Sequence, residues 1–282
     1  MLTVAVPNKG SLAAEASEML REAGYRQRTD SRELVLRDPD NDTEFFFLRP
    51  RDIATYVGSG RLEVGITGRD LLLDSRAEAR EILTLGFGAS TFRFASAGGQ
   101  ITSVDELTGQ RIATSYPGLV ESHLSSLGVV GTDVIRLDGA VETAVRLGVA
   151  DVIADVVATG TTLRQAGLEP FGDPILQSEA VLIRRWDADV DPQVDQLMRR
   201  LQGVKVARTY VMMDYDVPAD LVDAAVALTP GIESPTVSPL HREGWVAVRA
   251  MVPRAQTNRV MDALWDVGAR GILVTDIHAC RL

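Results

Sequence analysis

Apolar and polar positions alternate along the first 73 residues in blocks of two kinds. Short apolar runs such as Leu2–Pro7 are typical of buried strands, and the blocks between them repeat their apolar residues at helical spacing. Short strands separated by helices predict a parallel sheet with helices on both faces. The expected strands are 2–7, 43–48 and 62–67, and the expected helices are 11–23, 51–57 and 69–73.

A second unit of the same kind follows. Two more apolar runs occupy 81–87 and 91–97, and Ser103 with Glu106 has the spacing of a capping box that opens a short helix. A strand at 180–184 and a helix at 192–201 return toward the first unit, which predicts two lobes joined by two crossings, with a cleft between them. Within the second unit we expect strands at 111–115, 133–137 and 152–156, and helices at 119–126, at 141–147 and from about Thr161.

The order of elements changes after about Arg208. It becomes β-α-β-β-α-β, which is the order of a ferredoxin-like unit. The expected domains are residues 1–90 as lobe I, completed by about 180–208, residues 91–179 as lobe II, and residues 214–282 as a C-terminal domain. In that C-terminal domain we expect strands at 210–214, 233–237, 246–252 and 271–276, and helices at 219–227 and 257–267.

Composition narrows the class of protein. The 282 residues carry a net charge of -10 with a pI near 4.9, which disfavours nucleic acid as a partner, because duplex binding needs a basic face. No apolar run is long enough to span a membrane, and the N-terminus has no signal-peptide pattern, so a cytoplasmic location is expected. The single cysteine, Cys280, excludes an internal disulfide and Cys-based metal clusters.

The most informative segment is the turn after the expected strand 152–156. Small and hydroxyl residues open a helix there, so backbone amides can converge on an anion, and Gly160 permits close approach. Asp155 can accept hydrogen bonds from ribose hydroxyls. A common strand-to-helix turn with a threonine cap is the alternative, and neither a P-loop nor a Rossmann fingerprint is present. The candidate phosphate turn consists of Ala158, Thr159, Gly160, Thr161 and Thr162.

A second group of candidates follows the strands of the first lobe. Ligands of open α/β sheets bind beyond the carboxyl ends of the strands, so the turns after these strands should face one place. Lys9 offers a compact positive charge and Arg49 a bidentate fork, although Arg49 and Arg51 can equally be solvated surface charges. Asp70 can be a helix residue that only matches the dipole, and Tyr116 can be a packed turn aromatic.

Histidine is scarce, and no acid-base triad is expected. His123 and His241 have the pattern of surface residues and His278 that of edge structure, and no metal-ligand spacing links them. Any chemistry must therefore rely on positioning, on charge stabilisation and on a magnesium ion carried by the substrate.

Five segments together resemble the long form of ATP phosphoribosyltransferase, the first enzyme of histidine biosynthesis. The resemblance implies α/β architecture with two lobes like periplasmic solute-binding proteins, a C-terminal ferredoxin-like (ACT-like) regulatory domain, Mg²⁺-dependent catalysis, and a homohexamer in equilibrium with dimers. In that pentosyltransferase reaction, adenine N1 of ATP displaces pyrophosphate from phosphoribosyl pyrophosphate. The matching segments are Ala5-Val6-Pro7-Asn8-Lys9-Gly10, Phe46-Phe47-Leu48-Arg49-Pro50, residues 64–70, residues 154–163 and residues 230–236.

The resemblance also implies roles for individual residues. Lys9 and Arg49 would be catalytic, Asp70 and Tyr116 would place ATP, and Asp155 with the phosphate turn would hold phosphoribosyl pyrophosphate. The magnesium ligand would be Asp155 or Glu142. The C-terminal domain would bind L-histidine as feedback inhibitor, although the residues alone favour a plain oligomerisation domain. The residues matched to the histidine site are Asp216, Ile232, Ser234, Thr236 and Gly271.

Two other classes of protein remain open at this point. A two-lobed solute-binding protein would close on a ligand without catalysis, and the missing export signal weighs against it. A regulatory amino-acid-binding protein with inactive front lobes is the other. Turnover of bound substrates separates both from an enzyme.

Overall fold

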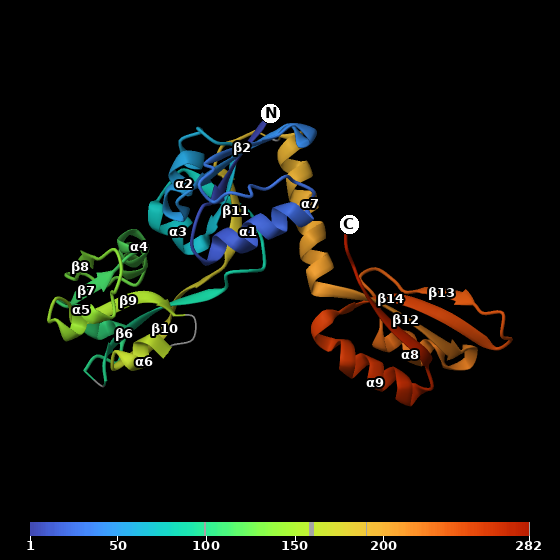
Figure 1. Cartoon of the computed structure of the whole chain (residues 1–282). Helices are drawn as coiled ribbons and strands as arrows, with labels where there is room; N and C mark the ends of the chain where they lie inside the picture. The colour runs from blue at the N-terminus through green and yellow to red at the C-terminus, as the bar shows by residue number, and fades with distance from the viewer. Residues whose placement is uncertain (99, 158–160, 190, 282) are drawn as a thin grey trace. The chain divides into compact units, whose positions relative to one another are not determined.

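The computed structural model describes residues 1–98, 100–157, 161–189 and 191–281. Its strands fall into three sheets, and the chain divides into two compact units (Figure 1). The first unit contains residues 1–21 and 25–194, and the second contains residues 22–24 and 195–282.

The first sheet has a parallel centre and antiparallel flanks. Strand β1 (Leu2–Pro7) pairs in parallel with β3 (Thr43–Leu48) and β4 (Val64–Gly68). Strand β11 (Ala180–Arg185) pairs antiparallel with β4 and with β5 (Ala79–Thr84), so the chain does return to the first sheet. The edge strand β2 (Val35–Asp38) and the helices α1 (Ser11–Glu22), α2 (Pro50–Gly58) and α3 (Arg69–Ser75) complete this part.

The second sheet runs in the order β10-β6-β9-β7-β8. Phe92 and Phe94 on β6 are fully buried in its core, beside Ile112 on β7. The capping box at Ser103 is present. The strands are β6 (Ser90–Ala97), β7 (Arg111–Thr114), β8 (Asp133–Arg136), β9 (Val152–Val157) and β10 (Leu168–Ser178), and the helices are η2 (Val104–Leu107), α4 (Pro117–Ser126), α5 (Thr143–Arg146) and α6 (Thr161–Gln165).

The second unit contains the ferredoxin-like order of elements. Its sheet runs β13-β14-β12-β15, and helices α8 (Val222–Leu228) and α9 (Thr257–Val267) lie together on one face (Figure 1). Buried Tyr215 bonds to Thr229 through its hydroxyl at 2.7 Å. The remaining elements are β12 (Tyr210–Pro218), η3 (Ala219–Leu221), β13 (Thr236–Pro239), β14 (Trp245–Pro253), η4 (Arg254–Gln256) and β15 (Arg270–Asp276).

Three features differ from the sequence-based expectation. Both sheets of the first unit are mixed rather than parallel, and they gain the unexpected edge strands β2 and β10. Pro170, Gly172 and Pro174 argue against a strand in sequence, and β10 accommodates them at a sheet edge with a bulge after Phe171. Helix α7 (Pro192–Thr209) runs past residue 201. Within it, the absence of a Cβ atom at Gly203 lets the backbone carbonyl of Cys280 pack closely against the helix.

Candidate active site

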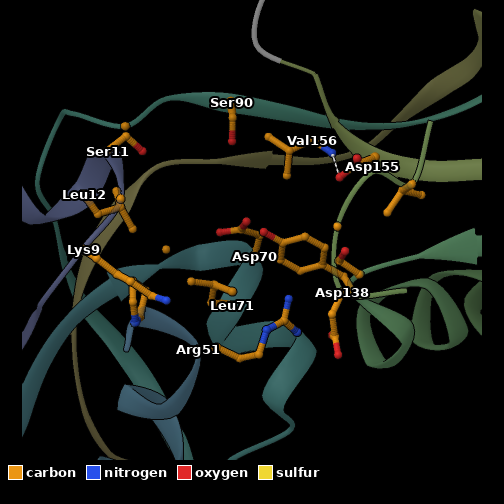
Figure 2. Close-up of a pocket in the computed structure, with 18 of the residues that line it drawn as sticks. Lys9, Ser11, Leu12, Arg51, Asp70, Leu71, Ser90, Asp138, Asp155 and Val156 are labelled. Carbon is orange, nitrogen blue, oxygen red and sulfur yellow. Dashed lines mark hydrogen bonds between the residues drawn. The ribbon is translucent and has the colours of Figure 1, made fainter. Parts of the chain in front are cut away.

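A cavity of about 710 Å³ lies within the first unit and is lined from both of its sheets. Figure 2 shows Lys9, Arg51 and Asp70 reaching it from the elements of the first sheet and Asp155 facing it from β9 of the second. The expected convergence of the first-lobe turns is therefore found for all three turns, since Lys9, Arg51 and Asp70 each come from a different one. Ser90 and Asp138 also line the cavity, and no sequence pattern singled them out.

Lys9 follows β1 and is exposed at the cavity. Arg49 precedes α2 and lines an adjoining groove together with Lys9, Arg51 and Arg136. Among the described residues, neither Lys9 nor Arg49 has a carboxylate partner, so both positive charges can attract an anionic ligand. Arg136 lies at 3.3 Å from the Asp138 carboxylate, which neutralises part of its charge.

Asp70 is the second residue of α3, and it is buried with 8% of its surface exposed. Its backbone N–H donates to the Ser178 hydroxyl at 3.1 Å, and that hydroxyl donates to Asp70 Oδ1 at 2.9 Å. A Cβ atom at Gly68 would overlap with Asp70 Oδ1, so glycine leaves room for this carboxylate. Asp70 is thus an acid in the first turn of a helix, where it matches the helix dipole, and it is also a fixed carboxylate at the cavity.

Tyr116 precedes α4 and stacks edge-on against Phe92, with ring centroids 5.2 Å apart. Tyr116 is therefore a packed turn aromatic, which was one of its two interpretations from the sequence, and it also lines the cavity. Burial raises the pKa of its phenol well above the usual value, and the negative charge of Asp70 and a hydrogen bond to that carboxylate raise it further. The phenol is consequently neutral at physiological pH and can donate a hydrogen bond.

Arg51 is not the solvated surface charge that its position in the sequence allowed. Its Nη1 lies 2.9 Å from Asp74 Oδ2, and its guanidinium lies over the Tyr116 ring, 5.0 Å from the ring centroid. Asp74 was not predicted as a site residue, because an acid inside a short helix carries no distinguishing signal in a single sequence.

Asp155 lies within β9, two residues before the strand ends. In the antiparallel strand register, its backbone lies opposite that of Arg93 on β6. Its Oδ1 accepts the Val156 N–H at 2.7 Å. Burial raises the pKa of Asp155, and the nearby charge of Glu142 adds to the increase, whereas the Val156 hydrogen bond opposes it. A cationic or hydroxyl-bearing ligand would suit this carboxylate.

Part of the candidate phosphate turn lies outside the described residues. This applies to Ala158, Thr159 and Gly160. Thr161 and Thr162 begin α6, as expected for a turn that opens a helix. The predicted role of the turn therefore stays a prediction.

The candidate histidine-site residues fall into two groups in the second unit. In the strand register, Asp216 on β12 lies opposite Arg270 on β15. An ideal Cβ at Gly271 would lie 3.4 Å from Asp216 Oδ2. The positive φ of 59° at Gly271 also favours glycine there. Exposed Ile232 and Ser234 precede the edge strand β13, which begins at exposed Thr236. Strand β14 separates β13 from β12, so these two strands run about 10 Å apart in the sheet.

The remaining findings concern the surroundings of His123, groups of possible metal ligands and possible membrane-spanning helices. His123 is partly buried against Phe94 rather than a surface residue, and burial lowers its pKa. Across the described part of the chain, no three His, Cys, Asp or Glu side chains gather in a group that could hold a metal ion. Within the same residues, none of the helices is long and apolar enough to span a membrane.

The fold and the cavity define a two-lobed α/β protein with an anion-attracting cleft and an additional ferredoxin-like domain. The family model described as ATP phosphoribosyltransferase matches residues 49–203, and that described as HisG, C-terminal domain, matches residues 207–279. Proteins named ATP phosphoribosyltransferase from Pseudarthrobacter chlorophenolicus and Streptomyces coelicolor are 66% and 65% identical, each over the full length of both chains.

A solved structure is also similar. It is a chain of the "ATP phosphoribosyl transferase (HisG:HisZ) complex from Thermotoga maritima", 26% identical, with a TM-score of 0.63 over 73% of this chain and 98% of that chain. The chain described here belongs to the ATP phosphoribosyltransferase family. Its activity is that of a pentosyltransferase in the first step of histidine biosynthesis.

Proposed function

We propose that the cavity binds ATP and phosphoribosyl pyrophosphate together and transfers the phosphoribosyl group to adenine N1. The N1 lone pair forms a bond to the anomeric carbon, the bond from that carbon to the pyrophosphate oxygen breaks, and pyrophosphate leaves with the electron pair. The lone pair needs no base to expose it, and none of the described residues that line the cavity is a histidine.

The observation that supports this function best is that one cavity has carboxylates from both of its lobes, Asp70 from the first and Asp155 from the second. Asp70 and the neutral phenol of Tyr116 provide a hydrogen-bonding group suited to the adenine of ATP. Asp155 faces them from β9, immediately before the candidate phosphate turn, where a ribose 5-phosphate would be held. Lys9 and Arg49 stabilise negative charge on the polyphosphates and on the leaving pyrophosphate.

Magnesium fits the oxygen ligands on the Asp155 side. Mg²⁺ commonly binds one or two carboxylates and completes its shell with water and substrate phosphates. Asp155 and Glu142 are near enough for the charge of one to raise the pKa of the other, and a divalent cation would relieve that repulsion. When bound, the ion would neutralise charge on pyrophosphate, and these two carboxylates would hold it.

We further propose that the C-terminal domain binds L-histidine as a feedback inhibitor and that the chain forms a homohexamer in equilibrium with dimers. Asp216 offers a carboxylate for a positively charged ligand, and Ser234 and Thr236 offer hydroxyls for a carboxylate. These groups lie on opposite sides of β14. A second copy that brings its β13 edge to Asp216 would complete the site.

The separate effects of two carboxylates on the two substrates test the proposed cavity. Asp70→Asn should raise the KM for ATP about tenfold and change the KM for phosphoribosyl pyrophosphate much less. Asp155→Asn should raise the KM for phosphoribosyl pyrophosphate about tenfold and change the KM for ATP much less. Asp105→Asn, on the exposed helix η2, serves as the matched control. Interchanged or equal effects would contradict the division, and tight binding without turnover would favour a solute-binding protein.

A further inference from the structure

Asp74 links helix α3 to helices α2 and α4 of the first unit. It lies on α3, and only 9% of its side chain is exposed. Its Oδ1 accepts the N–H groups of Gly118 at 2.9 Å and Leu119 at 3.3 Å, and its Oδ2 pairs with Arg51 at 2.9 Å. Asp74 itself is not among the residues that line the cavity.

Both sets of partners lead to Tyr116. Gly118 and Leu119 are the second and third residues of α4, whose first amides lack acceptors within the helix, and Tyr116 immediately precedes that helix. A carboxylate at this position satisfies two of the amides and complements the helix dipole. The Arg51 guanidinium, held by the other carboxylate oxygen, lies over the Tyr116 ring. One buried carboxylate therefore fixes the ring through the backbone and through its face.

The surrounding sequence is adapted to this contact. A Cβ atom at residue 118 would overlap with the backbone carbonyl of Asp74, so glycine allows α3 and α4 to approach. Arg76 and Glu121 form a second ion pair between the same helices at 2.8 Å, but their side chains are 55% and 49% exposed. Arg76 also donates to the Gly118 carbonyl at 3.2 Å, so the internal comparison is Glu121, whose carboxylate pairs with Arg76.

We propose that Asp74 is a positioning residue for ATP that acts on Tyr116, through the Arg51 guanidinium and through the start of α4. The inference rests on the proposed function, in which Tyr116 and Asp70 hold the adenine. A loss of the Asp74 carboxylate should free the start of α4 and the Arg51 guanidinium together. The Tyr116 ring then loses its fixed place, while the Asp155 side of the cavity on β9 keeps its own contacts.

The test compares the Michaelis constants of the full-length chain for both substrates. Asp74→Asn and Gly118→Ala should each raise the KM for ATP about tenfold and change that for phosphoribosyl pyrophosphate less than about twofold. Glu121→Gln, which breaks the exposed ion pair of the same junction, should leave both constants unchanged. Asp74→Glu keeps the charge and should recover part of the ATP affinity that Asp74→Asn loses.

A double variant separates positioning from general support of the fold. In a Tyr116→Ala background, Asp74→Asn should add less than about twofold to the KM for ATP, because the group through which it acts is gone. The inference would be overturned if the two substitutions multiplied their separate increases in the KM for ATP. It would also be overturned if Asp74→Asn raised the KM for both substrates equally. Wild-type chain without turnover of ATP, or a Tyr116→Ala variant with unchanged KM for ATP, would instead contradict the proposed function.

Discussion

Single glycines decide how closely the elements of the first unit approach one another. At Gly68 the missing Cβ leaves room for the Asp70 carboxylate, and at Gly118 it leaves room for the backbone of α3. Gly65 on β4 serves the core instead, because a Cβ there would lie 2.6 Å from Ile53 Cγ2 and 3.1 Å from Val57 Cγ2 of α2. In each case the side chain is absent for reasons of space rather than of backbone conformation.

Gly65→Ala should lower the free energy of unfolding by about 1 to 3 kcal/mol, because the added methyl overpacks a filled core. Urea unfolding followed by circular dichroism measures the change. Gly98→Ala is the matched control, since the nearest atom to its Cβ would be Glu169 Oε1 at an ordinary 3.6 Å. If the two variants were equally stable, the tight packing of β4 on α2 would be wrong.

His123 should make the stability of the first unit sensitive to acid. Burial lowers its pKa below the ordinary value of 6.5, so the unfolded chain takes up a proton that the folded chain resists. Stability should therefore fall as pH decreases from about 6.5 toward the folded pKa, and His123→Gln should lose less between those values. Unfolding of both proteins at pH 7.5 and 5.5 measures the difference. The control His241→Gln, at an exposed position, should lose as much stability at pH 5.5 as wild type. If His123→Gln also lost as much as wild type, the buried His123 would not cause the acid sensitivity.

At the scale of elements, the ends of strands and the starts of helices place the cavity residues. Ser178 ends β10 of the second sheet and exchanges two hydrogen bonds with Asp70 at the start of α3. The sequence allowed a prediction of α3 and of the Asp70 position, because apolar β4 leads directly into that helix. It gave no sign of Ser178, since β10 contains proline and glycine and its pairing with β6 depends on residues about 80 positions away.

Ser178→Ala should destabilise the chain by about 2 kcal/mol, because a buried carboxylate loses a hydroxyl donor and a backbone amide loses its acceptor. Thermal or urea unfolding provides the measurement. Ser125→Ala, at an exposed position on α4, should change stability by less than about 0.5 kcal/mol. Equal stability of the two variants would show that the link between β10 and α3 contributes little.

At the scale of the whole molecule, a cavity in one compact unit is combined with a ferredoxin-like domain in the other. The element order and the strand-end turns could be predicted from periodicity, and the family from its segments. The mixed pairing of the sheets and the ion pair of Arg51 with Asp74 could not, because both depend on contacts between distant residues. The proposed inhibition by histidine requires a free-energy coupling between the units, which must be equal in both directions.

Asp216→Ala should relieve the proposed inhibition by histidine and keep the turnover of the uninhibited enzyme, because Asp216 belongs to the second unit and the cavity residues belong to the first. Inhibition curves with and without the substitution measure the effect, and Asp220→Ala on the exposed helix η3 is the control. An unchanged inhibition constant in Asp216→Ala would move the effector to another site.

The most direct test of the account is a turnover assay of the full-length chain with ATP, phosphoribosyl pyrophosphate and Mg²⁺. Ultraviolet absorbance follows phosphoribosyl-ATP, and a coupled assay follows pyrophosphate. We predict that both products form in equal amounts and that omission of either substrate abolishes both. Binding of both substrates without either product, or release of pyrophosphate without phosphoribosyl-ATP, would contradict phosphoribosyl transfer in this cavity.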